Sequence, residues 1–165
     1  MKRSMLAVLL CVVAATALAD EVANVPVVDQ SPLPPIAKGW ARINPYRGLP
    51  VAIEVGGQTY AQTCARCHGP EADPARHPAP DLRRLDMACR RILDADLRAT
   101  CISDNDVFFS KSVREGKTVV GVVHMPAWEK VLGPKLIWAV RSYIETRPLP
   151  ARPQRSTEPE TASTH

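Results

Sequence analysis

The stretch Cys64-Ala65-Arg66-Cys67-His68 decides how the rest of this chain is interpreted. Two cysteines separated by two residues and followed directly by a histidine form the attachment signature of c-type haem. The spacing sets the two thiols about one helical turn apart, so that both can reach the vinyl groups along one edge of a porphyrin. The histidine then lies beneath the iron and offers an imidazole nitrogen as the proximal ligand. The pentapeptide therefore predicts one covalently attached haem c, held by Cys64, Cys67 and His68.

Cysteine pairs also occur in redox, zinc and structural sites, and each of these fits the chain less well. A thioredoxin-like redox pair needs strands that alternate with helices, and no such pattern surrounds the motif. A zinc site needs a second close pair of ligands, whereas Cys89 and Cys101 stand far apart in the chain. A structural disulfide between Cys64 and Cys67 would leave the adjacent histidine without a role.

The N-terminus has the features of a secretory signal peptide over residues 1–19. Lys2 and Arg3 provide a basic start, a short apolar run follows, and a cleavage site of small residues ends at Ala19. The apolar run is too short to span a bilayer, so we expect no integral membrane segment after cleavage. Export places the mature protein in the periplasm, where disulfides form and persist.

The composition fits one small domain with tails. The chain has 165 residues, 45% of them hydrophobic and 23% charged, and this length excludes a large multidomain enzyme. With two Phe, three Trp and three Tyr, the core has little aromatic material, and a bound cofactor is one way of filling it. The formal net charge of the full chain is +4, and removal of Lys2 and Arg3 with the signal peptide lowers it to +2 (19 basic against 17 acidic residues). So small a net charge does not indicate nucleic-acid binding.

Helical periodicity predicts an all-α domain. The expected helices cover residues 58–67 and 82–97, then run from Ser103 to Gly116, and from Gly133 to the residue before Pro148. Residues 118–123 are β-branched and interrupted by glycine, but this stretch is shorter than any of the helices.

Proline-rich composition marks both ends of the compact domain, which we place at residues 56–147. Residues 20–55 contain many prolines and almost no helical periodicity, which predicts an extended N-terminal arm. Residues 148–165 combine prolines with small polar residues and predict a mobile, disordered tail.

A second axial ligand must approach the other face of the haem. Two methionines remain after signal cleavage. Met87 falls in a predicted helix, where it is a typical core residue. Met125 lies in a nonhelical stretch just before Pro126, and a loop can pass around the porphyrin edge to bring it to the iron. His124 is the alternative, because imidazole also binds haem iron.

The compact domain resembles the monohaem class I cytochromes c, and in particular the cytochromes c-550 that serve quinoprotein alcohol dehydrogenases. Cys64, Cys67 and His68 match the family's haem-binding motif, and Met125 matches its distal methionine. Pro80 is similar to the proline whose carbonyl group holds the proximal histidine in the family. The resemblance implies the class I cytochrome c fold, with helices packed around one covalently bound haem.

The resemblance also implies a periplasmic carrier of single electrons, a monomer and not an enzyme. A PQQ-dependent alcohol dehydrogenase would be the donor, and a terminal oxidase or another cytochrome the acceptor. Two strong-field axial ligands leave no open position for a substrate. Two alternatives stay open. One is a cytochrome subunit of a larger redox complex, docked through residues 20–55, and the other is a haem-based enzyme or gas sensor with a labile sixth position.

Generic small cytochromes c have no counterpart of Cys89 and Cys101. The oxidising compartment, and the even number of cysteines left once Cys11 is removed, predict a disulfide between them that contributes about 3 kcal/mol by restricting the unfolded chain. Arginines are concentrated around this pair. They are interpreted as a solvated helical face, and the alternative is that they contact a haem propionate or an acidic docking partner. They are Arg83, Arg84, Arg90, Arg91 and Arg98.

Overall fold

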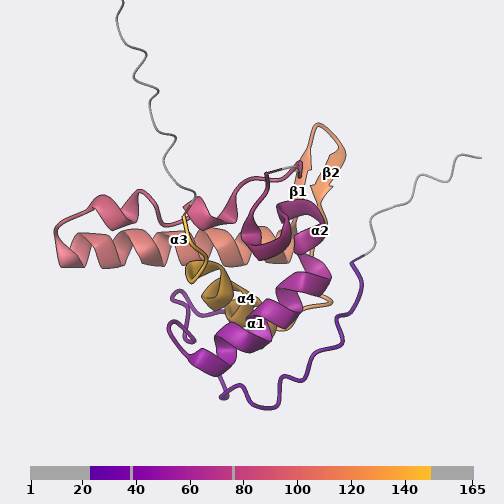
Figure 1. The fold of residues 1–165 in the computed structure, drawn as a ribbon, viewed down its shortest axis with the longest axis horizontal. Helices are drawn as coiled ribbons and strands as arrows, with labels where there is room; N and C mark the ends of the chain where they lie inside the picture. Colours follow the sequence, from indigo (N-terminus) through magenta and orange to yellow (C-terminus); the bar gives the residue numbers. More distant parts are fainter. Residues whose placement is uncertain (1–22, 38, 76, 150–165) are drawn as a thin grey trace, which may run out of the picture.

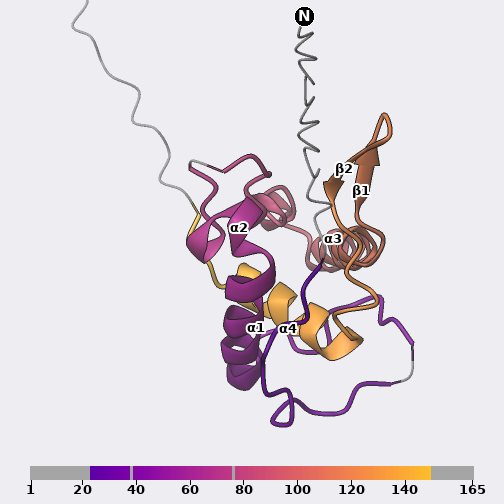
Figure 2. The ribbon, with the colours of Figure 1, turned by 90° about the vertical axis from the view of Figure 1, so that its right-hand side faces the viewer.

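Two helices that cross near their middles organise the fold. The computed structural model describes residues 23–37, 39–75 and 77–149. It places helix α1 (Pro50–Thr63) against the C-terminal helix α4 (Pro134–Glu145), and the two lie side by side at the centre of the molecule in Figure 1 and in Figure 2. Both helices begin with proline, whose fixed φ suits the first helical position and whose missing N–H has no partner there in any case.

Gly56 lets the two helices approach closely. A Cβ atom at this position would lie 2.0 Å from the carbonyl oxygen of Ala139 in α4, so any side chain here would push the helices apart. Beside this point the ring of Tyr143 packs on Tyr60, with centroids 5.2 Å apart. The crossing also buries almost the whole of α4, which therefore forms the centre of the core.

Helix α1 begins at Pro50, earlier than the helix expected over residues 58–67. The proline content of residues 20–55 predicts an extended arm, but Pro50 itself stands at a position that opens a helix. Residues 50–55, which the sequence predicts as part of the arm, therefore form the first turns of α1. The helix is interrupted at Cys64, and the short helix α2 (Ala65–His68) follows, then the 3-10 helix η1 (Pro70–Ala72).

The helix expected over residues 82–97 is wrong. The chain instead forms two short 3-10 helices, η2 (Leu82–Arg84) and η3 (Cys89–Arg91), before the long helix α3 (Ala95–Glu115) begins. The carboxylate of Asp94 accepts the backbone N–H of Leu97 at 2.8 Å and caps α3, so this helix starts at Ala95 rather than at Ser103. Met87 accordingly lies half-buried in a turn and not on a helix.

A short hairpin follows α3, so the structure is helix-rich without being purely α. Strands β1 (Lys117–Val119) and β2 (Val122–Met125) pair antiparallel, with Val119 opposite Val122. The β-branched residues on either side of the turn favour this pairing. The expectation of helices alone missed it because the run is so short. The hairpin projects beyond the end of α3 (Figure 1).

The arm lies against the core although it forms no helix or strand before Pro50 in the part that the structure describes. Leu33 and Tyr46 are buried, and the ammonium group of Lys135 in α4 donates to the carbonyl oxygen of Leu33 at 2.9 Å. The guanidinium carbon of Arg114 lies 4.4 Å from the centroid of the Trp40 ring. Side chains of the arm therefore complete the core around α3 and α4.

The two ends of the chain carry predictions that fall largely outside the described residues. The expected signal peptide over residues 1–19 lies wholly outside them, and only Pro148 and Leu149 of the expected tail are described. Within the described part, no helix combines the length and the apolar character needed to cross a membrane.

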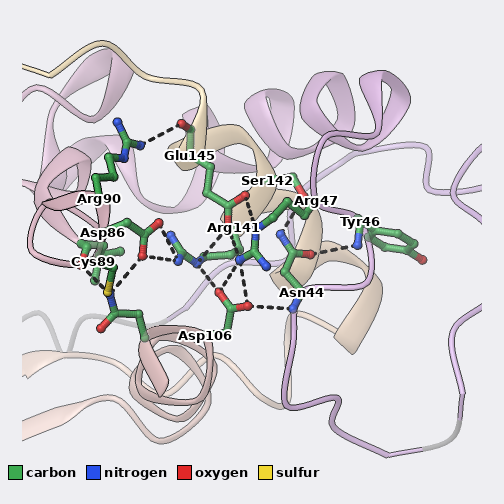
Figure 3. A network of polar contacts seen from close by, with 12 residues as sticks. Asn44, Tyr46, Arg47, Asp86, Cys89, Arg90, Asp106, Arg141, Ser142 and Glu145 are labelled. Atoms are coloured by element: carbon green, nitrogen blue, oxygen red, sulfur yellow. Dashed lines mark hydrogen bonds and ion pairs between the residues drawn. The ribbon is translucent and has the colours of Figure 1, made fainter. Parts of the chain in front are cut away.

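A buried ion network joins four segments that are distant in sequence (Figure 3). The fully buried Arg141 of α4 donates through Nη2 to both carboxylate oxygens of Asp86, at 2.8 and 2.9 Å. Its Nε donates to Asp106 of α3 at 2.9 Å. Asp106 also accepts from the backbone N–H of Asn44 and from Arg47, each at 2.8 Å. The arm, the turn around Asp86, α3 and α4 therefore meet at one buried point.

Replacing Arg141 with methionine should lower the free energy of unfolding by about 3 kcal/mol or more, because Asp86 would stay buried without a cation and Asp106 would keep only Arg47. Urea denaturation followed by circular dichroism measures the change. The matched control is Arg42→Met, at an exposed position of the arm, which should change stability by less than about 0.5 kcal/mol. A loss for Arg141→Met no larger than that of the control would show that the network adds no stability.

Candidate functional site

Helix α2 presents the two thiols and the histidine of the sequence motif. The backbone N–H groups of Cys67 and His68 donate to the carbonyl oxygen of Cys64 at 3.1 and 2.9 Å, which closes a single helical turn. Neither Cys64 nor Cys67 is in a disulfide. The hydroxyl of Tyr60 donates to the carbonyl oxygen of Gly69 at 2.9 Å and so holds the end of α2 against α1.

Burial of its sulfur raises the pKa of the Cys64 thiol to about 11. A hydrogen bond with Thr63, whose Oγ1 lies 3.3 Å from Sγ, acts in the opposite direction, and neighbouring Cys67 adds a small further rise. The Cys64 thiol is therefore protonated at neutral pH, and both sulfurs are reduced and available for thioether bonds.

The imidazole of His68 has a fixed orientation and a fixed tautomer. Its Nδ1 lies 2.9 Å from the carbonyl oxygen of Pro80. A carbonyl oxygen can only accept, so Nδ1 carries the proton and Nε2 keeps its lone pair. Burial lowers the pKa of His68 because it disfavours the imidazolium form, although the bond to Pro80 opposes this effect. The neutral ring, with one nitrogen held by a backbone carbonyl, is the form in which histidine binds a metal.

Charged side chains hold the segment that carries Pro80. Arg83 donates to the carboxylate of Asp81 from Nε and Nη2, at 2.9 and 3.0 Å, and to Asp73 at 3.1 Å. The hydrogen bond from Arg83 lowers the pKa of Asp81. The backbone N–H of Ala79 also donates to the carbonyl oxygen of Cys67 at 3.3 Å. The chain is therefore held by hydrogen bonds on both sides of Pro80, whose carbonyl oxygen accepts from His68. Arg83 already pairs with two carboxylates, those of Asp73 and Asp81.

Met125 ends β2 at a place where the strand crosses the end of α3. A Cβ atom at Gly116 would lie 2.4 Å from the carbonyl oxygen of Met125, and the φ of +71° at Gly116 also favours glycine. The backbone N–H of Trp128 donates to the carbonyl oxygen of Val113 at 2.9 Å, which fixes the chain just beyond. The sequence indicates Gly116 only as a helix end, because a close approach between distant backbones leaves no local pattern.

The two candidates for a second ligand differ in their surroundings. Met125 is half-buried and packs against the hydrophobic core, whereas the side chain of His124 is exposed. Helix α2 and the hairpin both lie towards the right-hand side of Figure 1, which is the side that faces the viewer in Figure 2. The structure thus brings Met125 to the side that carries the motif, and Met87 sits in the turn between η2 and η3.

These residues fit a c-type haem. The donor set on this side consists of two thiols, a neutral imidazole and a thioether, which are the groups that attach and ligate such a haem. The hairpin beside Met125 carries Val119, Val122 and Val123, which are 55%, 59% and 55% exposed and offer apolar surface for a flat hydrophobic ring.

The structure also contains the second pair of cysteines as a disulfide. Cys89 in η3 is joined to Cys101 in α3, with Cα atoms 5.6 Å apart. Of the clustered arginines, Arg84 pairs with Asp81 and Arg90 donates to the backbone carbonyl oxygen of Glu145.

The fold and this set of residues define a c-type cytochrome, and comparison with known proteins agrees. A family model described as cytochrome c oxidase, cbb3-type, subunit III matches residues 51–144. Cytochrome c550 of Pseudomonas aeruginosa is 35% identical over 123 residues, which cover 72% of this chain and 74% of that protein. No solved structure matches the chain. The chain belongs to the cytochrome c family, and it is an electron-transfer protein with covalently bound haem c rather than an enzyme.

If Cys64 and Cys67 form the thioether bonds, denaturing mass spectrometry should find the chain mass plus one haem in protein made by a host with a cytochrome c maturation system. Replacing both residues with alanine should give a mass without haem, since no covalent bond would remain. The matched control replaces Cys89 and Cys101 with alanine and should keep the haem. If the variant without Cys64 and Cys67 kept the haem and the control lost it, the assignment of the thioether bonds to Cys64 and Cys67 would be wrong.

Proposed function

We propose that this cytochrome is a periplasmic monohaem electron carrier, with haem c attached at Cys64 and Cys67 and its iron bound by His68 and Met125. The observation that carries the proposal is the orientation of His68. Its Nδ1 donates to Pro80, and its free Nε2 stands beside two reduced thiols within one turn of helix. Bound haem supplies a one-electron couple between ferric and ferrous iron.

The chain's own residues suit electron transfer without ligand exchange. Pairing with β1 holds the backbone before Met125, and Gly116 and the bond from Trp128 to Val113 hold it at and beyond Met125, so this ligand has little freedom to leave. Thioether ligation favours the reduced metal relative to a second imidazole and raises the potential. A firmly held sixth ligand argues against a haem-based enzyme or gas sensor, which needs that position to open.

The proposed donor is a PQQ-dependent alcohol dehydrogenase, and the proposed acceptor is a terminal oxidase or another cytochrome. Similarity to a cytochrome c550 along most of both chains supports a separate carrier of this kind. The second candidate is a cytochrome subunit of a larger redox complex, which the description of the matching family as an oxidase subunit favours. Gel filtration of the mature protein tests the proposed monomer against an obligate subunit.

Replacing Met125 with alanine should abolish the sulfur-to-iron charge-transfer absorption of the oxidised protein, lower the reduction potential and let external ligands bind, because the thioether would be gone. Absorption spectra and a redox titration measure these changes. The control is His124→Ala, next to it and exposed, which should leave the absorption in place. A charge-transfer band that survives in the Met125 variant and disappears in the His124 variant would assign the ligand to histidine.

The proposed donor is tested by mixing the oxidised cytochrome with a purified PQQ-dependent alcohol dehydrogenase and its alcohol in a stopped-flow spectrometer. The absorption bands of the reduced cytochrome should appear at a rate that saturates with cytochrome concentration, since the two proteins form a complex before transfer. Omitting the alcohol is the control and should give no reduction. A rate equal to this control in the complete mixture would exclude the dehydrogenase as donor.

A further inference from the structure

One part of the molecule extends into solvent away from the haem-binding residues. We call residues 89–101 the stapled segment, because the disulfide between Cys89 and Cys101 closes it. Figure 1 shows the N-terminal end of α3 on the opposite side of the molecule from α2 and the hairpin. Residues 93–100 are all exposed. None of the residues proposed to bind the haem lies in the stapled segment, so electron transfer does not explain this part of the chain.

The stapled segment keeps a defined shape although little of it packs on the core. Its first helical turns are too short to be stable alone. The disulfide, the Asp94 cap and a bond of 3.2 Å from Arg98 Nη1 to the carbonyl oxygen of Ile92 hold them. At its base Asn105 donates to the carbonyl oxygen of Leu85 at 2.7 Å and to Cys89 Sγ at 3.2 Å. The segment is therefore a rigid projection.

The stapled segment carries apolar side chains that no described residue covers. Leu93 is 95% exposed and Leu97 is 58% exposed. Holding two leucines in water forgoes the favourable free energy that burial of each side chain would contribute. A surface that is both preorganised and apolar loses little entropy when a partner covers it.

The charge of the stapled segment indicates the kind of partner that it binds. Three arginines of the stapled segment outnumber its two carboxylates, and one of the carboxylates, Asp94, is engaged in capping α3. Arg91 and Arg98 are exposed and have no ion pair with any described residue. Guanidinium groups beside an apolar patch are typical of a protein interface, where they pair with carboxylates at the rim.

We propose that the stapled segment docks a redox partner protein, with Leu93 and Leu97 in an apolar recess and Arg91 and Arg98 against carboxylates that border it. The inference rests on the proposed function in one respect, that this cytochrome exchanges electrons with other proteins. Because the segment lies away from α2 and Met125, it contributes to binding and selection of the partner and not to the electron-transfer step.

The test compares two double variants with two matched controls, all as haem-loaded full-length protein. Arg91→Glu with Arg98→Glu reverses the charge, and Leu93→Ser with Leu97→Ser removes the apolar contact. The charge control is Arg42→Glu, and the apolar control is Val27→Ser, whose side chain is 90% exposed on the arm. Absorption spectra and the rate of reduction by ascorbate, which needs no docking, should be the same for the wild type and all four variants.

Two partners are used as probes. The purified PQQ-dependent alcohol dehydrogenase reduces the cytochrome, and membranes that contain the terminal oxidase of the same organism oxidise it. With at least one partner, each double variant should raise the KM for the cytochrome about tenfold, a typical loss for central interface residues, and leave kcat unchanged. The controls should change KM by less than about twofold. Added salt should raise the wild-type KM more steeply than that of the arginine variant.

The outcomes separate the inference from the proposed donor. If the dehydrogenase does not reduce wild-type cytochrome, the donor is wrong and the oxidase measurement decides the inference. Values of KM that match the controls with both probes would overturn the docking role. Sedimentation that shows a wild-type dimer, and a monomer for the leucine variant, would also overturn it, because a second copy of the chain would then be the occupant.

Discussion

The close approach of α1 and α4 at Gly56 is the constraint on which the rest of the structure depends. It brings the two backbones nearer than any side chain would permit and so fixes how α1 lies on α4. The thiols and His68 come directly after α1, so α2 starts from a helix that is fixed against the core. Tyr60 and Tyr143 pack beside the same point, and Tyr60 also holds Gly69. The Gly56 contact thus sets the packing of the core, and Tyr60 links that packing to the turn that carries the sequence motif.

Each of the two proposed iron ligands is held by backbone contacts rather than by its own side-chain packing alone. His68 is oriented by the carbonyl group of Pro80, whose segment is tied down by Arg83. Met125 is positioned by a strand that must pass over Gly116 at the end of α3. Ligands fixed in this way keep their geometry in both oxidation states, and little reorganisation is the condition for fast electron transfer.

The sequence predicted what depends on neighbours within one turn, and it missed what depends on distant contacts. The haem motif, Gly116 as a helix end and Met125 in a nonhelical stretch all follow from local residues. The helix over residues 82–97 was wrong because leucines at helical spacing also occur in tight turns, and Asp94 starts a new helix inside that range. Nothing in the spacing around Arg141 indicates that it binds Asp86 and Asp106, since those residues meet only in the folded chain.

Helix α3 connects the two functional ends of the molecule without transmitting strain between them. Its 21 residues span about 31 Å, with the stapled segment at the N-terminal end and the contact with Met125 at the C-terminal end. Between these ends Asp106 is fully buried and bonded to Arg141, Arg47 and Asn44. Moving α3 would separate these charges inside the core, which is costly. A partner bound at the stapled segment would therefore leave Met125, the proposed distal ligand, and with it the reduction potential, unchanged.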